Sequence, residues 1–140
     1  MESMSSPVIV LTEDESYSKL ETEKLGRLVV RRSDDMDIFP INYVVDGKNI
    51  YFRTAEGNKL FSVGLNNYVL FEVDNSTAYT AWSVVIKGHA EIVRDYSEIQ
   101  RCDALPLRPW VPTLKYNYVR IEPKEISGRA FRLGEEPERY

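Results

Sequence analysis

Two cations and a hydroxyl lie close together in one short segment. Arg53, Thr54 and Lys59 place a guanidinium, a hydroxyl and an ammonium within seven residues, around the glycine at position 57. This set suits a phosphate monoester, because arginine binds oxyanions through paired hydrogen bonds and lysine adds a point charge. A helix that begins after the glycine would add free backbone N–H groups. The alternative is a solvated turn with two unrelated cations, and the spacing alone favours that alternative.

Two tryptophans offer flat aromatic surfaces. Trp82 is followed by Ser83 at the start of a β-rich run, so the pair can wall a ring-shaped ligand and hydrogen-bond to it. Trp110 lies in a proline-rich loop, 105–113. For both tryptophans the alternative is an ordinary core or interface aromatic. The residue types alone favour that alternative.

A third candidate segment comprises Pro40, Ile41, Asn42 and Tyr43. In a strand, Asn42 and its neighbours can present polar groups to a flat heterocycle. Asn42 can equally satisfy a backbone group at the end of a strand. The spacing does not decide between these interpretations.

Several other kinds of site are excluded by residue counts. The chain has one histidine, His89, and one cysteine, Cys102, so His/Cys metal-site spacings and an internal disulfide are both excluded. It lacks Gly-x-Gly-x-x-Gly after a strand and lacks a Walker loop. A Ser-His-Asp triad would need His89, which lies within a strand-like run without a nucleophile elbow. Paired catalytic carboxylates stay open among the 22 acidic residues.

Length, composition and charge predict one cytoplasmic domain over residues 1–140, with 1–11 and 134–140 flexible. The formal net charge of −4 does not favour nucleic acid as a partner. The N-terminus lacks the apolar stretch of a signal peptide, and the apolar runs are far shorter than the ~20 residues that cross a bilayer. We therefore expect neither a nucleic-acid partner nor a membrane partner.

The pattern of elements predicts a mainly β fold with short helices. Thr12 and Glu15 form a capping box for a helix that we expect to end at Gly26, and Asp95 with Glu98 opens a second helix. A short helix is expected to start near residue 59. Asp46-Gly47 predicts a hairpin turn, and Gly88 a bulge or a bend. Six or seven strands at short spacing indicate an antiparallel barrel, and the expected strands are 28–30, 39–45, 49–54, 68–73, 81–94, 115–121 and 126–133.

Taken in order, these segments resemble the pyridoxamine 5′-phosphate oxidase-like family of FMN-binding split barrels. The resemblance is strongest over residues 24–95, and its specificity lies in the ordered set of segments. The matching stretches are Gly26–Val30, Phe39–Tyr43, Ile50–Thr54 with Lys59 five residues on, Val69–Asp74 and Trp82–Ala90.

The resemblance implies a homodimeric six- to seven-stranded split barrel with FMN between the subunits. It implies that Arg53, Thr54 and Lys59 hold the phosphate and that Pro40, Ile41, Asn42 and Tyr43 lie against the isoalloxazine. Trp82 and Ser83 would come from the partner subunit, and Trp110 is a further candidate cofactor contact. The expected activity is that of a flavin-dependent oxidoreductase acting on a small organic substrate.

The sequence departs from true pyridoxamine phosphate oxidases at its C-terminal end. Those enzymes have an Arg-x-x-Arg-Leu-type substrate segment, which Arg129–Leu133 resembles only loosely. Oxidation of pyridoxamine phosphate is therefore not expected. Two alternatives stay open: a reductase that uses the deazaflavin F420, and a non-catalytic flavin-binding protein. F420 would need extra cations, with Arg27, Arg31 and Lys87 as candidates. Haem, which other family members bind, would have only His89 as an axial ligand. Candidate proton donors are Tyr43, Tyr79 and Tyr116.

Overall fold

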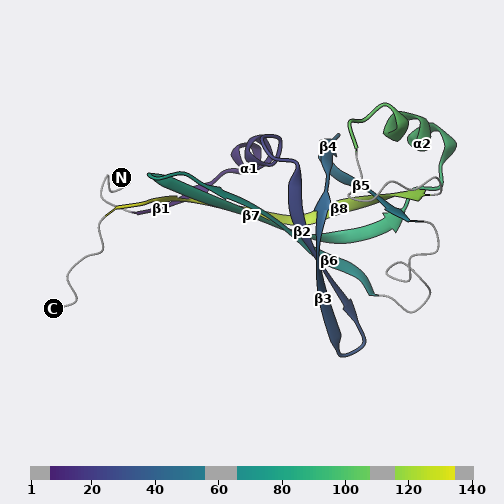
Figure 1. Ribbon diagram of the computed structural model, residues 1–140, viewed down its shortest axis with the longest axis horizontal. Helices are drawn as coiled ribbons and strands as arrows, with labels where there is room; N and C mark the ends of the chain where they lie inside the picture. Colours follow the sequence, from purple (N-terminus) through teal and green to yellow (C-terminus); the bar gives the residue numbers. More distant parts are fainter. Residues whose placement is uncertain (1–6, 56–65, 108–115, 135–140) are drawn as a thin grey trace.

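The computed structural model describes residues 7–55, 66–107 and 116–134, whose arrangement is shown in Figure 1. These residues form eight strands and two helices. The elements are β1 (Val8–Leu11), α1 (Glu13–Leu20), β2 (Leu25–Arg32), β3 (Asp35–Asn42), β4 (Val44–Asp46), β5 (Asn49–Ala55), β6 (Asn66–Ser76), β7 (Thr80–Ile92), α2 (Tyr96–Asp103) and β8 (Tyr116–Arg132).

All eight strands belong to one antiparallel sheet. Its order is β3-β2-β6-β7-β8-β5-β4, and β1 pairs with the C-terminal end of β8. The sheet curls so that β3 lies against β5, although these two strands do not pair. The mainly β, antiparallel architecture predicted from the sequence is confirmed, with eight strands in the described residues instead of six or seven.

The hairpin predicted at Asp46-Gly47 is confirmed. Asp46 pairs with Asn49, which leaves Gly47 and Lys48 as the two turn residues of the β4–β5 hairpin. Both have positive φ, 57° and 66°, as the type I′ turn that suits twisted hairpins requires. The Tyr17 hydroxyl of α1 donates to the Lys48 carbonyl at 2.9 Å and so fixes this turn against the helix.

A bulge lies opposite Gly88, but its extra residue is Lys124 on β8, because Lys87 pairs with Glu125 and Gly88 with Pro123. The register between β7 and β8 shifts between Lys87 and Gly88. A Cβ at Gly88 would lie only 2.2 Å from the carbonyl oxygen of Glu122 on β8, so no other residue fits this crossing without a shift of the backbone.

The first helix begins as predicted but ends earlier. The Thr12 backbone N–H donates to Glu15 Oε1 at 2.8 Å, and the Glu15 N–H donates to Thr12 Oγ1 at 3.1 Å, which completes the capping box. The expected stop at Gly26 is wrong, because α1 ends at Leu20 and Gly26 lies inside β2. A Cβ on Gly26 would lie 2.4 Å from Phe71 Cζ, so this glycine allows close packing of the core and does not cap a helix.

Two other segments differ from the sequence-based expectation. Part of the expected flexible lead-in, 1–11, is the strand β1. The single strand expected over 39–45 is divided at Tyr43, because β3 pairs with β2 whereas β4 pairs with β5. The Tyr43 backbone N–H donates instead to the Lys24 carbonyl at 3.0 Å.

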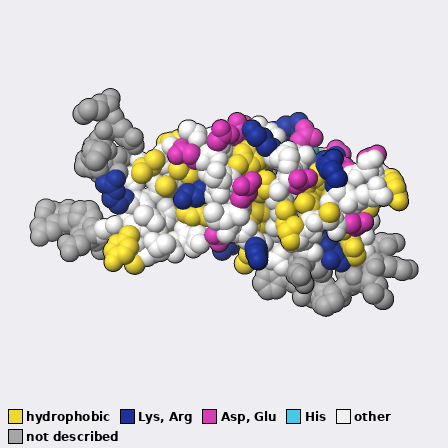
Figure 2. Space-filling view, turned by 90° about the horizontal axis from the view of Figure 1, so that it is seen from above, with side chains coloured by type: hydrophobic (Ala, Val, Ile, Leu, Met, Phe, Trp, Pro, Cys, Tyr) yellow, Lys and Arg dark blue, Asp and Glu magenta, His cyan; other side chains and the backbone are white. Residues whose placement is uncertain are grey.

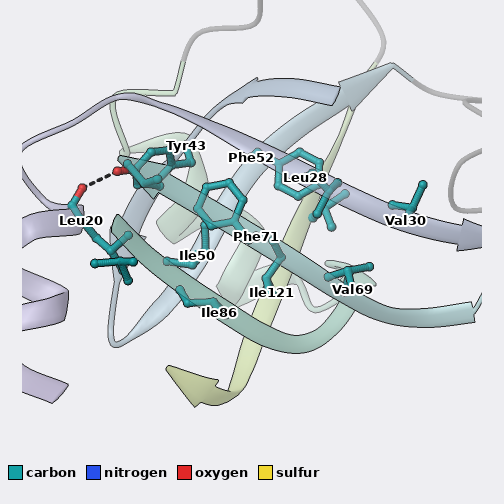
Figure 3. Packing of buried hydrophobic residues seen from close by; sticks show 14 of the residues in the cluster. Leu20, Leu28, Val30, Tyr43, Ile50, Phe52, Val69, Phe71, Ile86 and Ile121 are labelled. Carbon is teal, nitrogen blue, oxygen red and sulfur yellow. Dashed lines mark hydrogen bonds between the residues drawn. The ribbon is translucent and has the colours of Figure 1, made fainter. Parts of the chain in front are cut away.

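Two hydrophobic clusters lie on opposite faces of β5 and β8. The larger fills the barrel, and Figure 3 shows Phe71 at its centre with Tyr43 beside it. The ring centroids of these two residues are 5.0 Å apart in an edge-to-face arrangement. The smaller cluster lies under α2 and contains Tyr51, Val93, Cys102, Leu107 and Tyr118. Neither α1 nor α2 has the length and apolar character that a membrane crossing requires.

Candidate functional site

Arg53 and Thr54 are adjacent on β5 and face opposite sides of the sheet. Paired residues on neighbouring strands share a face, and successive residues alternate between faces. Arg53 pairs with Tyr118 of the α2-side cluster, whereas the preceding Phe52 belongs to the barrel core. Thr54 therefore continues the barrel-side face. The two side chains can meet one ligand only where β5 ends, one residue later at Ala55.

The Arg53 side chain is stacked on an aromatic ring. Its Cζ lies 3.5 Å from the ring centroid of Tyr116, a distance typical of a guanidinium on the face of an aromatic side chain. Its Nε is buried and has no hydrogen-bond partner within the part of the chain that the structure describes. A buried donor without an acceptor is costly, so this guanidinium is suited to receive an anionic oxygen.

The segment Pro40–Tyr43 divides into residues that face outward and residues that belong to the core. Pro40 is exposed and Asn42 half-buried, both on the outer face, whereas Ile41 packs against the barrel core. Tyr43 is buried, and its hydroxyl donates to the Leu20 carbonyl. Burial raises the pKa of the Tyr43 phenol, with the nearby Glu23 carboxylate as a second cause. Tyr43 is thus a packing residue with a committed hydroxyl.

A cavity of about 520 Å³ opens beside this segment. Its walls are largely aliphatic and aromatic, and its charged groups are two carboxylates and one ammonium. This volume is in the range that holds small organic ligands. The lining residues are Leu20, Glu21, Glu23, Lys24, Asn42, Tyr43, Val44, Val45 and Pro106.

Trp82 and Ser83 lie near the start of β7 and also face opposite ways. Trp82 is half-buried against the barrel core, with Lys19 Nζ 5.9 Å from its ring centroid. The Ser83 hydroxyl lies on the outer face and donates to Glu72 Oε2 at 3.3 Å. Within one protomer, Trp82 makes the contacts of a packing residue.

Within one chain, Arg53 lies far from Trp82 and Ser83. Arg53 pairs with Tyr118 on β8, and Trp82 pairs with Ala130, twelve residues further along the same strand. At roughly 3.3 Å per residue, an extended strand of that length spans about 40 Å. A single flavin-sized ligand cannot contact both groups of one protomer.

The outer face near Ser83 carries a cluster of charges. Arg27 Nη1 donates to Glu72 Oε1 and to Asp74 Oδ2, both at 2.9 Å. Burial, followed by the neighbouring Asp74, raises the pKa of Glu72, and Arg27 opposes this shift. Lys87 lies 3.9 Å from Glu125. Two of the three cations named for F420, Arg27 and Lys87, thus have acidic neighbours, and Figure 2 shows basic, acidic and apolar side chains interspersed on the visible face.

Sequence reasoning missed the polar network that fixes α2 beside Arg53. Glu98 was expected to complete a capping box, but its carboxylate accepts from Arg120 Nη1 at 2.6 and 2.7 Å and from the Tyr51 hydroxyl at 2.7 Å. Asp95 still caps the helix through the Glu98 N–H at 3.1 Å. The available signal was the alternation of Tyr116, Tyr118 and Arg120, which places three polar or aromatic side chains on one face of β8.

The remaining predictions concern residues that are not described, metal binding, His89 and Tyr79. Lys59, Trp110 and the helix expected near residue 59 lie outside the described residues. Among the described residues, no three histidine, cysteine or acidic side chains are grouped to hold a metal ion. The ring of His89 lies 5.2 Å from that of Tyr68, and Tyr79 is 78% exposed at the β6–β7 turn.

Comparison with known proteins identifies the family. Residues 12–130 match the family described as pyridoxamine 5′-phosphate oxidase. A candidate pyridoxamine 5′-phosphate oxidase from Corynebacterium glutamicum is 60% identical with a TM-score of 0.90, covering 96% of this chain and 100% of that one. The FAD-binding protein of Mycobacterium smegmatis is 41% identical with a TM-score of 0.80, covering 90% of this chain and 100% of that one.

A curated relative extends the match beyond solved structures. An uncharacterized protein of Mycobacterium tuberculosis is 42% identical over 96 residues, which is 69% of this chain and 87% of the relative. The extent of the family match, together with the mainly β split-barrel architecture, confirms the resemblance drawn from the sequence. The chain therefore belongs to the pyridoxamine 5′-phosphate oxidase family.

Proposed function

We propose that the protein binds FMN with the phosphate against Arg53 and serves in the cytoplasm as a flavin-dependent oxidoreductase for a small organic substrate. The observation that carries the proposal is the state of Arg53, whose guanidinium is stacked on Tyr116 and whose buried Nε has no partner among the described residues. An anionic phosphate oxygen supplies the acceptor that the described residues do not. The flavin-binding function of the M. smegmatis relative supports the same cofactor class.

The remaining contacts follow from the family resemblance and from the outer face of β3. Thr54 and Lys59 complete the phosphate site, while Pro40 and Asn42 present their side chains toward the ring system. A bound flavin supplies the hydride chemistry, and this chain's residues bind it and orient it. The 520 Å³ cavity that Asn42 lines offers room for the substrate beside the ring.

We also propose that two copies of the chain complete each site. Trp82 and Ser83 lie about 40 Å along β8 from Arg53 in one protomer, so they can serve the same flavin only from a partner. A two-fold axis brings the same surface of each copy together and creates two equivalent sites. Leu25, Met36 and Ile38, which are 43%, 67% and 61% exposed on the outer face of β2 and β3, offer apolar area for such an interface.

The direct test is to titrate the flavin-free protein with FMN and with riboflavin while tryptophan emission is read. Arg53→Ala should weaken FMN binding by about 10- to 100-fold, the equivalent of one or two charge-assisted hydrogen bonds, and should change riboflavin binding less than about threefold. Arg101→Ala is the matched control, because Arg101 is exposed on α2 and its nearest acidic partner, Asp46, is 3.8 Å away. Equal losses for FMN and riboflavin would contradict the phosphate site.

The same preparation distinguishes the alternatives. FAD is the second candidate cofactor, favoured by the 41% identical FAD-binding protein of M. smegmatis. Tight binding of F420 without binding of FMN or FAD would favour the deazaflavin alternative. Sedimentation should give the mass of a dimer, and a monomer that still binds FMN tightly would contradict the shared site. Bound flavin that no small acceptor reoxidises would favour the non-catalytic alternative.

A further inference from the structure

Two tyrosines lie beneath Arg53 on the outer face of β5 and β8. Arg53 pairs with Tyr118 and Ala55 pairs with Tyr116, so Tyr116 is the diagonal neighbour of Arg53 on the same face. The 3.5 Å separation of Arg53 Cζ from the Tyr116 ring centroid follows from this register. Stacking leaves the edge of the planar guanidinium, which carries its N–H donors, as the part that can meet an anion.

The Tyr116 ring is itself held in place. It meets Tyr118 edge to face, with the ring centroids 5.4 Å apart and the planes at 78°. Tyr118 is buried, and its hydroxyl donates to Asp103 Oδ1 at 2.6 Å. Burial, and then the hydrogen bond to Asp103, raise the pKa of Tyr118, so this hydroxyl keeps its proton and continues to donate.

Asp103 has a fixed position because α2 is anchored against the sheet. Figure 1 shows α2 over the end of the sheet where β5 and β8 lie. Cys102, next to Asp103, is buried in the α2-side cluster. One turn earlier, Glu98 accepts hydrogen bonds from Tyr51 of β5 and Arg120 of β8. The helix is therefore attached to both of the strands that carry Arg53 and its aromatic support.

We propose that Tyr116 is a positioning residue for phosphate binding, which holds the Arg53 guanidinium in its binding orientation while Tyr118 and Asp103 hold Tyr116. The inference rests on the proposed function, because it assigns Tyr116 a role only through Arg53 and the phosphate. A free arginine side chain populates many rotamers, and ordering it when the ligand arrives weakens binding. The stack orders it beforehand. Tyr116 is required for its ring and not for its hydroxyl.

The test compares Tyr116→Leu, which removes the ring, with Tyr116→Phe, which keeps it. For Tyr116→Leu we expect FMN binding to weaken about tenfold, the value of a partly desolvated cation–π contact, with riboflavin binding within about twofold of the native protein. Tyr116→Phe should bind both flavins within about twofold of native. Thermal unfolding of each variant establishes the folded fraction to which binding is referred.

A double variant distinguishes a role of Tyr116 through Arg53 from a merely structural role. If Tyr116 acts through Arg53, the Tyr116→Leu substitution should cause no further loss of FMN affinity in an Arg53→Ala background. Equal weakening of FMN and riboflavin by Tyr116→Leu, or full additivity with Arg53→Ala, would overturn the positioning role and leave the phosphate site standing. If Arg53→Ala itself leaves FMN binding unchanged, both the phosphate site and the positioning role are overturned.

Discussion

The barrel core and the cluster under α2 share two strands but are built differently. Ile50 and Phe52 of β5 point into the barrel, where the buried side chains are almost entirely apolar. Tyr51, between them, points to the other face, where its hydroxyl bonds to the Glu98 carboxylate. The same strand thus contributes to a cluster held by packing and to a cluster held by packing together with directional polar bonds.

The two clusters therefore have different roles: the barrel core provides stability, and the cluster under α2 fixes the position of the helix. Burial of apolar area is non-directional, so the barrel core contributes stability without fixing the orientation of any polar group. Hydrogen bonds between hydroxyls, carboxylates and a guanidinium have strict geometry, and those under α2 are partly buried, so this cluster fixes where the helix lies. The proposed phosphate-binding arginine lies on the second of these faces.

The largest loss of stability is expected from a substitution that creates a cavity in the barrel core. Phe71 is fully buried at its centre, so Phe71→Ala should lower the free energy of unfolding by about 3–5 kcal/mol, measured by urea denaturation. The preference of the folded fraction for FMN over riboflavin should stay unchanged, because the core lies on the opposite face of β5 from Arg53. Cys102→Ala in the other cluster removes a smaller side chain and should cost about 1 kcal/mol. A changed FMN preference in Phe71→Ala would break the separation of the two regions.

An intermediate loss of stability is expected when Glu98 is substituted. Burial tends to raise the pKa of this carboxyl, but the hydrogen bonds from Arg120 and Tyr51 outweigh it, so the pKa is lowered. The resulting stability is present above the ordinary glutamate pKa of about 4.3 and is lost as the pH falls through the lowered value. Glu98→Gln should cost about 1–3 kcal/mol at neutral pH, with the deficit shrinking below about pH 4.3.

The control for that measurement is Glu91→Gln. Glu91 lies 3.3 Å from the same Arg120, but its side chain is 58% exposed, so the expected cost is at most about 0.5 kcal/mol. A deficit in Glu98→Gln that stays constant down to pH 2 would show that the carboxylate charge does not hold α2.

The smallest effect, with the opposite pH dependence, is expected from Glu72 on the outer face. Burial and Asp74 raise its pKa, so its contribution to stability is most favourable below the ordinary glutamate value and falls as the pH rises through the raised value. Glu72→Gln should change the free energy of unfolding by less than about 1 kcal/mol at neutral pH. Relative to native protein, the variant should gain stability as the pH rises from about 4.3. The same slope as Glu98→Gln would contradict the contrast.

Features set by neighbours in the sequence were predicted well. The Thr12 capping box and the Asp46-Gly47 hairpin each depend on a few adjacent residues. Gly26 was misread because its role depends on Phe71, which lies 45 positions away on another strand. The strand β1 was missed because its pairing with residues 128–131 of β8 joins the two ends of the chain.

In the candidate site, too, features carried by adjacent residues were predicted and long-range contacts were not. Arg53 stood out by its residue type beside Thr54 and Lys59. The sequence named Tyr116 only as a candidate proton donor, since its place under Arg53 depends on the register between β5 and β8. That register, like the attachment of α2 through Arg120, is a long-range property that no local pattern contains.

The strand β8 gives the protein a particular order of folding. Its 17 residues pair with β1, β5 and β7, so this strand holds together three strands that the ribosome makes earlier. Such non-local pairing slows folding, because large loops must close before contacts compensate for the lost entropy. Until β8 emerges, β5 and β7 each keep an open edge that can pair with other chains. The newly made chain is thus most exposed to aggregation before β8 has paired with β5 and β7.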